Sequence, residues 1–307
     1  MLRLKLFLTV AGLLLVVETP LQAAQPILDD TPRIVVMSAF APEWQVLLKR
    51  TVGQKEYRLN GKRFVTGKLA GKDVVLVVSG MSMVNAAMTA QEAIDRFTVS
   101  AIVFSGIAGG ADPSLTIGDV VVPGQWAEYL ESVFARKVDG HFVLPSFFSA
   151  KDLYPNFGMI FPKKVDVTRK GSNGPEKRFW FPVDARLLAV ARHVAKDVTL
   201  GNCDPKGNCL AHKPTVMVGG NGVSGQSFVD NAKFRTYAFD TFKAKVLDME
   251  TAAVAHVAYA NGVPYIAFRS LSDLAGGGES ANEIHVFLAL ASANAAKVVT
   301  AFLTAMP

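Results

Sequence analysis

Short, uninterrupted runs of apolar residues recur along the chain, and most of the segments between them have helix-like spacing. We interpret six runs as strands, at residues 33–40, 73–80, 100–106, 119–123, 215–223 and 263–270. Continuous apolar runs of this length are typical of strands that are buried on both faces of a sheet. The pattern therefore predicts a sheet that is covered by helices.

Helix-like segments alternate with these runs, at residues 42–50, 83–97, 184–196, 249–261 and 282–305. Gly262 directly follows the fourth segment, and Pro264 comes two residues later, which is a typical helix stop. The alternation predicts an α/β fold: one domain, residues 25–307, with a central, mostly parallel mixed sheet flanked by helices. Residues 140–180 are rich in Lys, Pro, Gly and Phe, and we interpret them as an insertion in this domain.

The first 24 residues have the features of a secretory signal peptide. Arg3 and Lys5 precede an uncharged run at residues 6–17, and small residues follow at Ala23 and Ala24. The run is shorter than the roughly 20 apolar residues that a membrane-spanning helix needs. We therefore predict that residues 1–24 are a cleaved leader, that the mature protein is periplasmic or secreted, and that it has no stable membrane insertion.

The composition excludes a disordered protein, because 50% of the 307 residues are hydrophobic and only 19% are charged. The formal charge is +6, which is too mild an excess to indicate a nucleic-acid partner. Residues 162–178 hold most of this excess. We interpret them as a solvated loop, and binding of polyanions at a cell surface is the alternative.

Cys203 and Cys209 lie six positions apart in a segment rich in turn residues. In an oxidising compartment this spacing predicts a local disulfide. The alternative is a metal site that includes His212, but three ligands on one loop lack a clear fourth. The sequence contains no metal motif, phosphate-binding loop or dinucleotide fingerprint, so we expect no metal and no cofactor.

Charged and glycine-rich segments follow several of the predicted strands, where open α/β sheets bind their ligands. Residues 247–277 (LDMETAAVAHVAYANGVPYIAFRSLSDLAGG) hold Glu250, Arg269 and Asp273 among apolar and small residues. Glu250 and Asp273 could simply be favoured near helix starts. Arg269 lies inside a buried strand and needs a partner, for which Glu43 is the candidate.

Several of these segments together resemble the purine nucleoside phosphorylase and nucleosidase superfamily, and most closely its 5′-methylthioadenosine/S-adenosylhomocysteine nucleosidase branch. The resemblance rests on residues 247–277 and on the segments SAFAPEWQVLL, SGIAGGADPSLTIGDVVVP and SGQSFVDN. It covers most of the chain outside residues 125–210. Met-Glu followed by Arg-x-x-Ser-Asp at this spacing is specific, whereas the glycine-rich loop alone is not.

The resemblance implies roles for three catalytic residues. Asp273 would be the general acid at N7 of the purine, and Glu43 would activate the water that attacks the sugar. Arg269 would hold the region around Glu43 in place. Cleavage of an N-glycosidic bond builds positive charge on the sugar and negative charge on the base, so both carboxyl groups are needed. We expect burial to raise the pKa of Asp273, and Glu43 to stay ionised beside Arg269.

The resemblance also implies the residues that contact the substrate. Met249 and Glu250 would contact the sugar, Phe228 would stack on the base, and the backbone of Val229 would contact the edge of the base. Four further positions complete the expected substrate-binding set: Met81, Ala108, Gly109 and Ser272.

The identity of the nucleophile depends on residues around the glycine-rich loop. Phosphorylases of the bacterial hexameric type carry an arginine and a serine there, where this chain has Phe104 and Ile107. A phosphate dianion needs cationic and hydroxyl partners, so hydrolysis is favoured and phosphorolysis is the alternative. We expect a purine nucleoside substrate similar to adenosine, inosine or methylthioadenosine.

Ile107 also departs from the nucleosidases, which usually have Ser or Thr at this position. The segment GIAGGADPSL is in addition similar to exported plant storage-type relatives. A nucleoside-binding or uptake protein without catalysis is therefore a second alternative. Nucleosidases of this branch are dimers, so the resemblance implies a homodimer.

Overall fold

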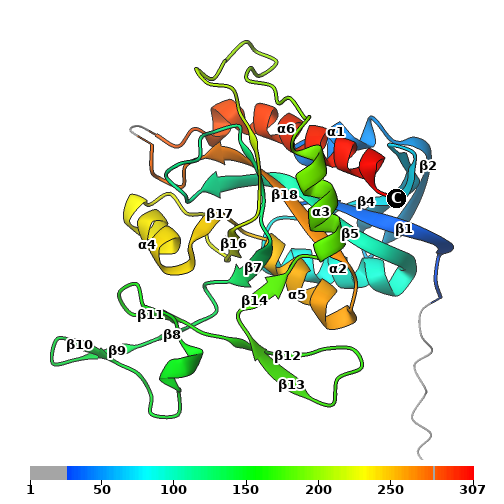
Figure 1. Ribbon diagram of the computed structural model, residues 1–307. Helices are drawn as coiled ribbons and strands as arrows, with labels where there is room; N and C mark the ends of the chain where they lie inside the picture. The colour runs from blue at the N-terminus through cyan, green and yellow to red at the C-terminus, as the bar shows by residue number, and fades with distance from the viewer. Residues whose placement is uncertain (1–25, 279–280) are drawn as a thin grey trace, which may run out of the picture.

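The computed structural model describes residues 26–278 and 281–307 (Figure 1). The predicted signal peptide, residues 1–24, lies outside the described residues. The helices are α1 Ala41–Leu48, α2 Met83–Arg96, α3 Ala185–Val194, α4 Ala232–Phe242, α5 Thr251–Asn261 and α6 Ile284–Ala305.

A mixed sheet of twelve strands runs through the described part of the protein. Its strands are β1 Asp29–Ser38, β2 Val52–Leu59, β3 Lys62–Leu69, β4 Lys72–Val78, β5 Phe97–Gly110, β6 Val120–Val122, β7 Gln125–Glu128, β14 Trp180–Pro182, β15 Val216–Val218, β16 Asn221–Ser224, β17 Ala244–Asp248 and β18 Tyr265–Asp273. In the centre, β4, β1, β5 and β18 are parallel neighbours. These are the strands with the longest apolar runs, as expected for strands buried on both faces.

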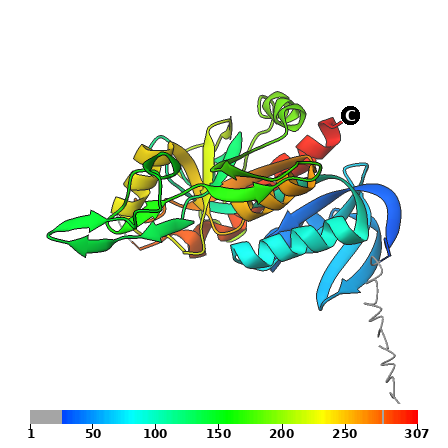
Figure 2. The same cartoon turned by 90° about the horizontal axis from the view of Figure 1, so that it is seen from below.

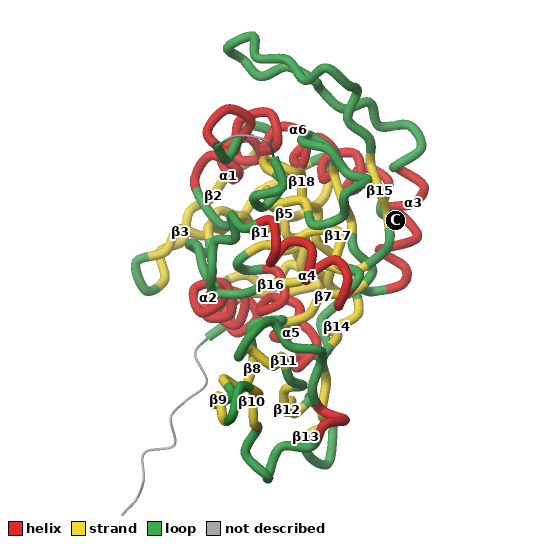
Figure 3. The backbone as a smooth tube through the Cα atoms, turned by 90° about the vertical axis from the view of Figure 1, so that its left-hand side faces the viewer, coloured by secondary structure: helices red, strands yellow, loops and turns green. Residues whose placement is uncertain are grey.

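Helices cover both faces of the sheet (Figures 1 and 3). On one face α6 packs against β18 and β5 and is flanked by α1 and α3, whereas on the other face α2 packs against α5. The predicted α/β fold with a mixed sheet between helices is therefore confirmed. Among the described residues, α6 is the one helix long and apolar enough to cross a membrane, but 56% of its most apolar stretch is buried inside the protein.

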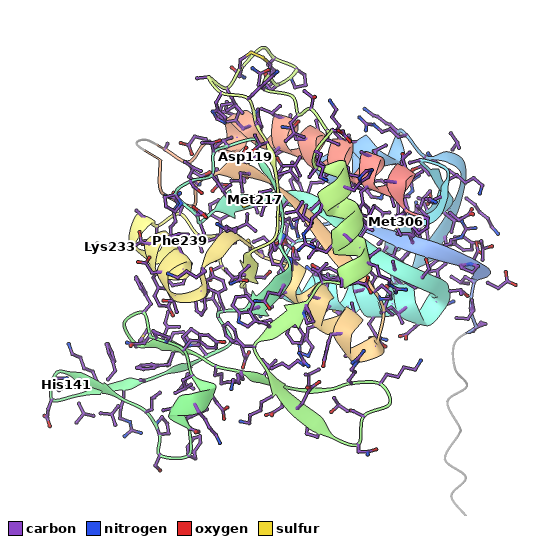
Figure 4. The ribbon with its side chains drawn as sticks, viewed as in Figure 1. Asp119, His141, Met217, Lys233, Phe239 and Met306 are labelled. Carbon is purple, nitrogen blue, oxygen red and sulfur yellow. A yellow bond between two sulfur atoms is a disulfide. The ribbon has the colours of Figure 1, made fainter. Side chains whose placement is uncertain are left out.

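Residues 132–178 contain six short strands that pair outside the main sheet. They form three antiparallel pairs: β8 Ser132–Phe134 with β11 Ile160–Pro162, β9 Arg136–Val138 with β10 His141–Val143, and β12 Val165–Thr168 with β13 Pro175–Arg178. The β9–β10 hairpin projects far from the main sheet (Figure 2), and His141 is labelled near its tip (Figure 4).

Residues 162–178 are not the single solvated loop that their charge indicated. The β12–β13 hairpin lies within this range, and Val167 of β12 is buried. The sequence VDVT alternates apolar and polar side chains, which is a strand pattern that the charge run obscures.

Two further expectations are corrected or completed by the structure. The run at residues 215–223 is two strands, β15 and β16, because Gly219 and Gly220 turn the chain with φ angles of +116° and +75°. The predicted disulfide between Cys203 and Cys209 is formed. It closes a short loop between α3 and β15, so its expected stabilisation is only about 2 kcal/mol.

Candidate active site

A cavity of about 230 Å³ lies where the carboxyl ends of several central strands meet. It is lined by Ala39, Phe40, Glu43, Met81, Ile107, Ala108, Gly109, Ser227, Phe228, Val229, Leu247, Asp248, Met249, Glu250, Ser272, Asp273, Ile284 and Leu288. Every candidate catalytic or substrate-binding residue proposed from the sequence lines this cavity except Arg269, which is completely buried. The strand ends therefore gather the candidate residues into one place.

Glu43 lies in the first turn of α1 and is 98% buried. Its carboxylate accepts hydrogen bonds from the backbone N–H groups of Ala39 and Ile107, each at 2.8 Å, and from that of Phe40 at 3.4 Å. Burial raises the pKa of Glu43 to about 7, although the charge of Arg269 and the N–H donors lower it in part. Glu43 is therefore poised to exchange a proton near neutral pH, instead of staying fully ionised as expected.

Arg269 forms its ion pairs with residues other than Glu43. Its Nε lies 2.7 Å from Oδ2 of Asp248, and its Nη2 lies 3.8 Å from Oε2 of Glu250. The guanidinium group also stacks over the ring of Phe104 at 4.2 Å. The expected pairing with Glu43 is corrected because three backbone N–H groups already occupy the Glu43 carboxylate, whereas Asp248 ends a strand directly beside the guanidinium group.

Asp248 is the main residue of this region that the sequence reasoning missed. The Ser224 and Thr251 hydroxyl groups donate to its carboxylate, and the Thr251 N–H donates at 3.2 Å. The Thr251 hydroxyl also accepts from Nε of Arg269 at 2.8 Å. The sequence does contain a signal for Asp248: it is a second acidic residue, two positions before Glu250, in the same apolar segment that contains Arg269.

Glu250 is the N-cap residue of α5 and lines the cavity. Its Oε1 accepts a hydrogen bond from the backbone N–H of Ser82 at 2.9 Å. Ser82 has a φ of +90°, a strained conformation for a residue with a side chain. Burial, followed by the nearby charge of Asp248, raises the pKa of Glu250 to about 7.

Asp273 ends β18 and is 97% buried. Its Oδ1 accepts from the N–H of Ala275 at 2.8 Å and from the Asn282 amide at 3.4 Å, and its Oδ2 accepts from the Ser272 hydroxyl at 2.9 Å. Burial is the largest influence and raises the pKa of Asp273, in the direction expected for an acid, while these hydrogen bonds oppose it. Asn282 was not among the residues identified from the sequence.

Apolar side chains form most of the rest of the cavity wall, together with Gly109, Ser227 and Ser272. Phe228 lies at the edge of the cavity and is 55% exposed, whereas Val229, which also lines the cavity, is buried. Ile284 and Leu288 of α6 also line the cavity, although the sequence reasoning named neither. Among the described lining residues there are four carboxyl groups and no Lys, Arg or His side chain. The cavity therefore favours ligands that are neutral or that develop positive charge.

Gly106 is required for the approach of two candidate catalytic side chains. The pairing of β18 with β5 places Arg269 beside Gly106. A Cβ atom at Gly106 would lie 2.0 Å from Nη1 of Arg269 and 2.7 Å from Oε1 of Glu43. We predict that Gly106→Ala lowers the free energy of unfolding by about 1–3 kcal/mol and reduces activity, because one of these groups must move. Urea denaturation and steady-state kinetics measure the two effects.

Gly174→Ala is the matched control for this substitution, because a Cβ atom at Gly174 would meet nothing within 4 Å. The control is expected to change neither stability nor activity. Equal behaviour of the two variants would contradict the assignment of Gly106 as a site of close approach.

Comparison with known proteins identifies the family of the chain. Residues 33–304 match the Phosphorylase superfamily. The chain belongs to this superfamily. This superfamily protein is 29% identical to bark storage protein A of Populus deltoides over 255 residues. The aligned region covers 80% of this chain and 78% of the storage protein. It is 27% identical to the 5′-methylthioadenosine/S-adenosylhomocysteine nucleosidase of Mycobacterium bovis, covering 86% and 94% of the two chains.

Solved structures share the fold of this chain. The 5′-methylthioadenosine/S-adenosylhomocysteine nucleosidase of Neisseria meningitidis, in complex with methylthio-immucillin-A, superposes with a TM-score of 0.66 at 25% identity, covering 89% of this chain and 99% of that one. Futalosine hydrolase of Helicobacter pylori superposes with a TM-score of 0.67 at 24% identity, covering 90% and 98% of the two chains. This superfamily protein therefore has relatives named as enzymes and relatives named as storage proteins.

Proposed function

We propose that the protein hydrolyses the N-glycosidic bond of a purine nucleoside and releases the free base and the sugar. The observation that carries this proposal is the convergence of Glu43, Glu250 and Asp273, which come from three different parts of the chain, on one largely apolar cavity. The similarity to nucleosidases adds support.

Each carboxyl group has a role in the proposed reaction. Asp273, protonated, donates its proton to the purine, which becomes a better leaving group. Glu43, ionised, accepts a proton from the attacking water. Glu250 accepts hydrogen bonds from the sugar hydroxyls, and the negative charge in the cavity stabilises the positive charge that develops on the sugar. Phe228, at the cavity edge, stacks on the base.

The charge of the cavity favours water over phosphate as the nucleophile. A phosphate dianion would enter a cavity lined by four carboxyl groups and no cationic side chain in the described chain. Such a dianion requires charged donors to offset the cost of its desolvation. Arg269 is not available to it, because this guanidinium group is completely buried and already paired with Asp248.

A panel of nucleosides tests the proposal. Purified protein is expected to release free base from adenosine, inosine, guanosine or methylthioadenosine in phosphate-free buffer, with no increase when phosphate is added. Base release that appears only with phosphate would identify a phosphorylase instead.

A nucleoside-binding protein without catalysis is the second candidate. It is favoured by the apolar side chain of Ile107 in the cavity and by the similarity to bark storage protein A. Calorimetry with adenosine or inosine separates the two candidates. Tight binding without release of base would support the binding protein, whereas turnover of the bound nucleoside would exclude it.

The pKa values of the carboxyl groups predict how activity depends on pH. Glu43 and Glu250 act as carboxylates and have pKa values of about 7, so kcat/KM is expected to rise as the pH increases towards and through 7. Asp273 acts as an acid and its pKa is raised, so its deprotonation is expected to lower kcat/KM. Initial rates over a series of buffers measure this profile. A rate that falls steadily as the pH rises through 7 would contradict the role of Glu43 as a base.

We also propose that the protein is a homodimer. Met81 is 63% exposed at the cavity, and Val84, Met88 and Phe228 are also exposed large apolar side chains. Met81 and Phe228 line the cavity, and Val84 and Met88 lie on α2, which follows Met81. Exposed apolar residues of this kind are typical of a surface that a partner covers. Analytical ultracentrifugation is expected to show a dimer that Met88→Glu dissociates, and a wild-type monomer at every concentration would exclude this assembly.

We further propose that the protein is exported, on the basis of the signal-peptide pattern of residues 1–24 and the Cys203–Cys209 disulfide. Mass spectrometry of the N-terminus of the protein recovered from its native compartment tests this. A mature N-terminus after Ala23 or Ala24 is expected, and an intact Met1 would contradict it.

A further inference from the structure

A second cavity, of about 430 Å³, lies at the other end of β18 from the candidate active site. Tyr265, the first residue of β18, lines this second cavity. Asp273, the last residue of β18, lines the candidate active site. A strand of this length spans about 26 Å, so one small ligand cannot occupy both cavities. Its lining residues belong mainly to the β12–β13 hairpin, the start of α3 and the end of α5. Figure 1 shows where these elements lie.

Three guanidinium groups line this second cavity, from Arg169, Arg178 and Arg186, and Asp184 is the one carboxylate among the described lining residues. The cavity therefore has the opposite charge to the candidate active site. Arg186 is 84% exposed in its side chain and lies 3.5 Å from Asp184, so solvent screens much of this pair.

The guanidinium groups of Arg169 and Arg178 both lie over a single aromatic ring. Their guanidinium groups lie 5.0 Å and 4.3 Å from the centre of the Tyr259 ring. Nε of Arg178 is also 3.2 Å from Oε1 of Glu176, and the Tyr259 hydroxyl donates to the same carboxylate oxygen. Stacking on an aromatic ring fixes the plane of a guanidinium group while leaving N–H groups at its edge free to donate.

The backbone beside Arg169 is anchored as well. The N–H of Lys170 donates to the carbonyl of Ala260 at 2.7 Å, and the Ser172 hydroxyl donates to the carbonyl of Arg169 at 2.7 Å. Among the described residues the Arg169 guanidinium group contacts the Tyr259 ring, and its charge helps to lower the pKa of Glu176, although the two groups are not within ion-pairing distance of each other. Its positive charge is therefore only partly compensated.

An adjoining cavity extends the same surface. Arg169 and Gly262 line both the second cavity and this adjoining one, and Lys170 and Ser172 line the adjoining cavity in addition. At the start of α3, the N–H groups of Arg186 and Leu187 donate to Asp184 and are not available to a ligand. The arginine side chains supply the cationic donors of this cavity.

We propose that this cavity is a second ligand site, which binds a small molecule through a phosphate or sulfate group. Two guanidinium groups over the same ring can donate to the paired oxygen atoms of such an anion. The volume is within the range of small-molecule sites, and Val263 and Pro264 offer an apolar wall to the rest of the molecule. This site does not depend on the reaction proposed for the first cavity.

Calorimetric titration at constant ionic strength tests the proposal, with inorganic phosphate, sulfate and glycerol 3-phosphate as probes and chloride as the reference. Saturable binding of one anion per chain is expected. Arg169→Gln/Arg178→Gln should weaken it by about tenfold or more. Arg58→Gln/Arg63→Gln is the control, because these arginines also lie on a β-hairpin but do not line this cavity; both of them pair with Glu56.

Three results would overturn the proposal: no saturable binding of any probe, equal affinity in the two double variants, or loss of anion binding when methylthio-immucillin-A occupies the first cavity. Arg169→Lys guards against misfolding of the double variant, because it retains the charge at an exposed position but lacks the guanidinium fork. It should bind the anion more weakly than the wild type while unfolding at the same temperature.

Discussion

Replacement of Asp273 by asparagine is expected to lower kcat for base release by about 10²–10⁴-fold, which is the usual contribution of general acid catalysis. Asparagine has nearly the same shape and can still accept the hydrogen bond that the Ala275 N–H donates at 2.8 Å. It has no acidic proton to give to the departing purine. Steady-state kinetics with the best nucleoside of the panel measures the loss.

Binding should survive this substitution, because the cavity wall is otherwise unchanged. Calorimetry with the same nucleoside is expected to give a dissociation constant similar to that of the wild type, and thermal unfolding should show an intact fold. Asp240→Asn, at an exposed position of α4, is the matched control and should leave kcat unchanged. If Asp273→Asn retained most of the wild-type kcat, Asp273 would not be the acid.

The central strands and the cavity residues could be predicted because local patterns determine them. The strands β1, β4, β5 and β18 are continuous apolar runs, and the residues that follow or end them line the cavity. Parallel strands bring such ends to one edge of the sheet, so position in the sequence translates directly into proximity.

Elements that form only through contacts with distant parts of the chain were not predicted from the sequence. The edge strand β2 is mostly exposed and polar, and it is defined by its pairing with β3. Helix α4 was missed because most of its large apolar residues are aromatic and pack into a separate small core, in which the Tyr129 ring lies tilted against Phe234 and edge-on to Phe242. Neither feature produces a strong period in the sequence.

The partner of Arg269 could not be chosen from the sequence for a related reason. Glu43, Asp248 and Glu250 were all acidic residues that could reach a buried arginine. The selection depends on which carboxylate is already satisfied by backbone N–H groups, and those of Ala39 and Ile107 meet Glu43 only after α1 and β5 are assembled. Sequence spacing does not contain this information.

Replacement of Arg269 by methionine is expected to lower the free energy of unfolding by about 3–5 kcal/mol at pH values above 7. The guanidinium group is completely buried, and its removal would leave Asp248 and Glu250 without their cationic partner. Methionine fills a similar volume, so the loss of stability measures mainly the effect of the unpaired carboxylate charge and not the effect of an empty cavity. Urea denaturation measures it.

The size of this loss should itself depend on pH. The pKa values of Glu43 and Glu250 are about 7 even with Arg269 present, so both groups take up protons as the pH falls below 7 and the unpaired negative charge decreases. The destabilisation is therefore expected to be smaller at acidic pH than at alkaline pH. Adding Asp248→Asn to the variant should recover part of the loss, because the two residues are directly paired.

Arg58→Met is the control for this experiment, since the Arg58 side chain is 71% exposed in a surface ion pair and its removal should change stability by less than about 0.5 kcal/mol. A loss of that small size for Arg269→Met at both acidic and alkaline pH would contradict the argument. It would mean that the carboxyl groups around position 269 are neutral throughout, and that the buried arginine does not hold negative charge beside the proposed substrate.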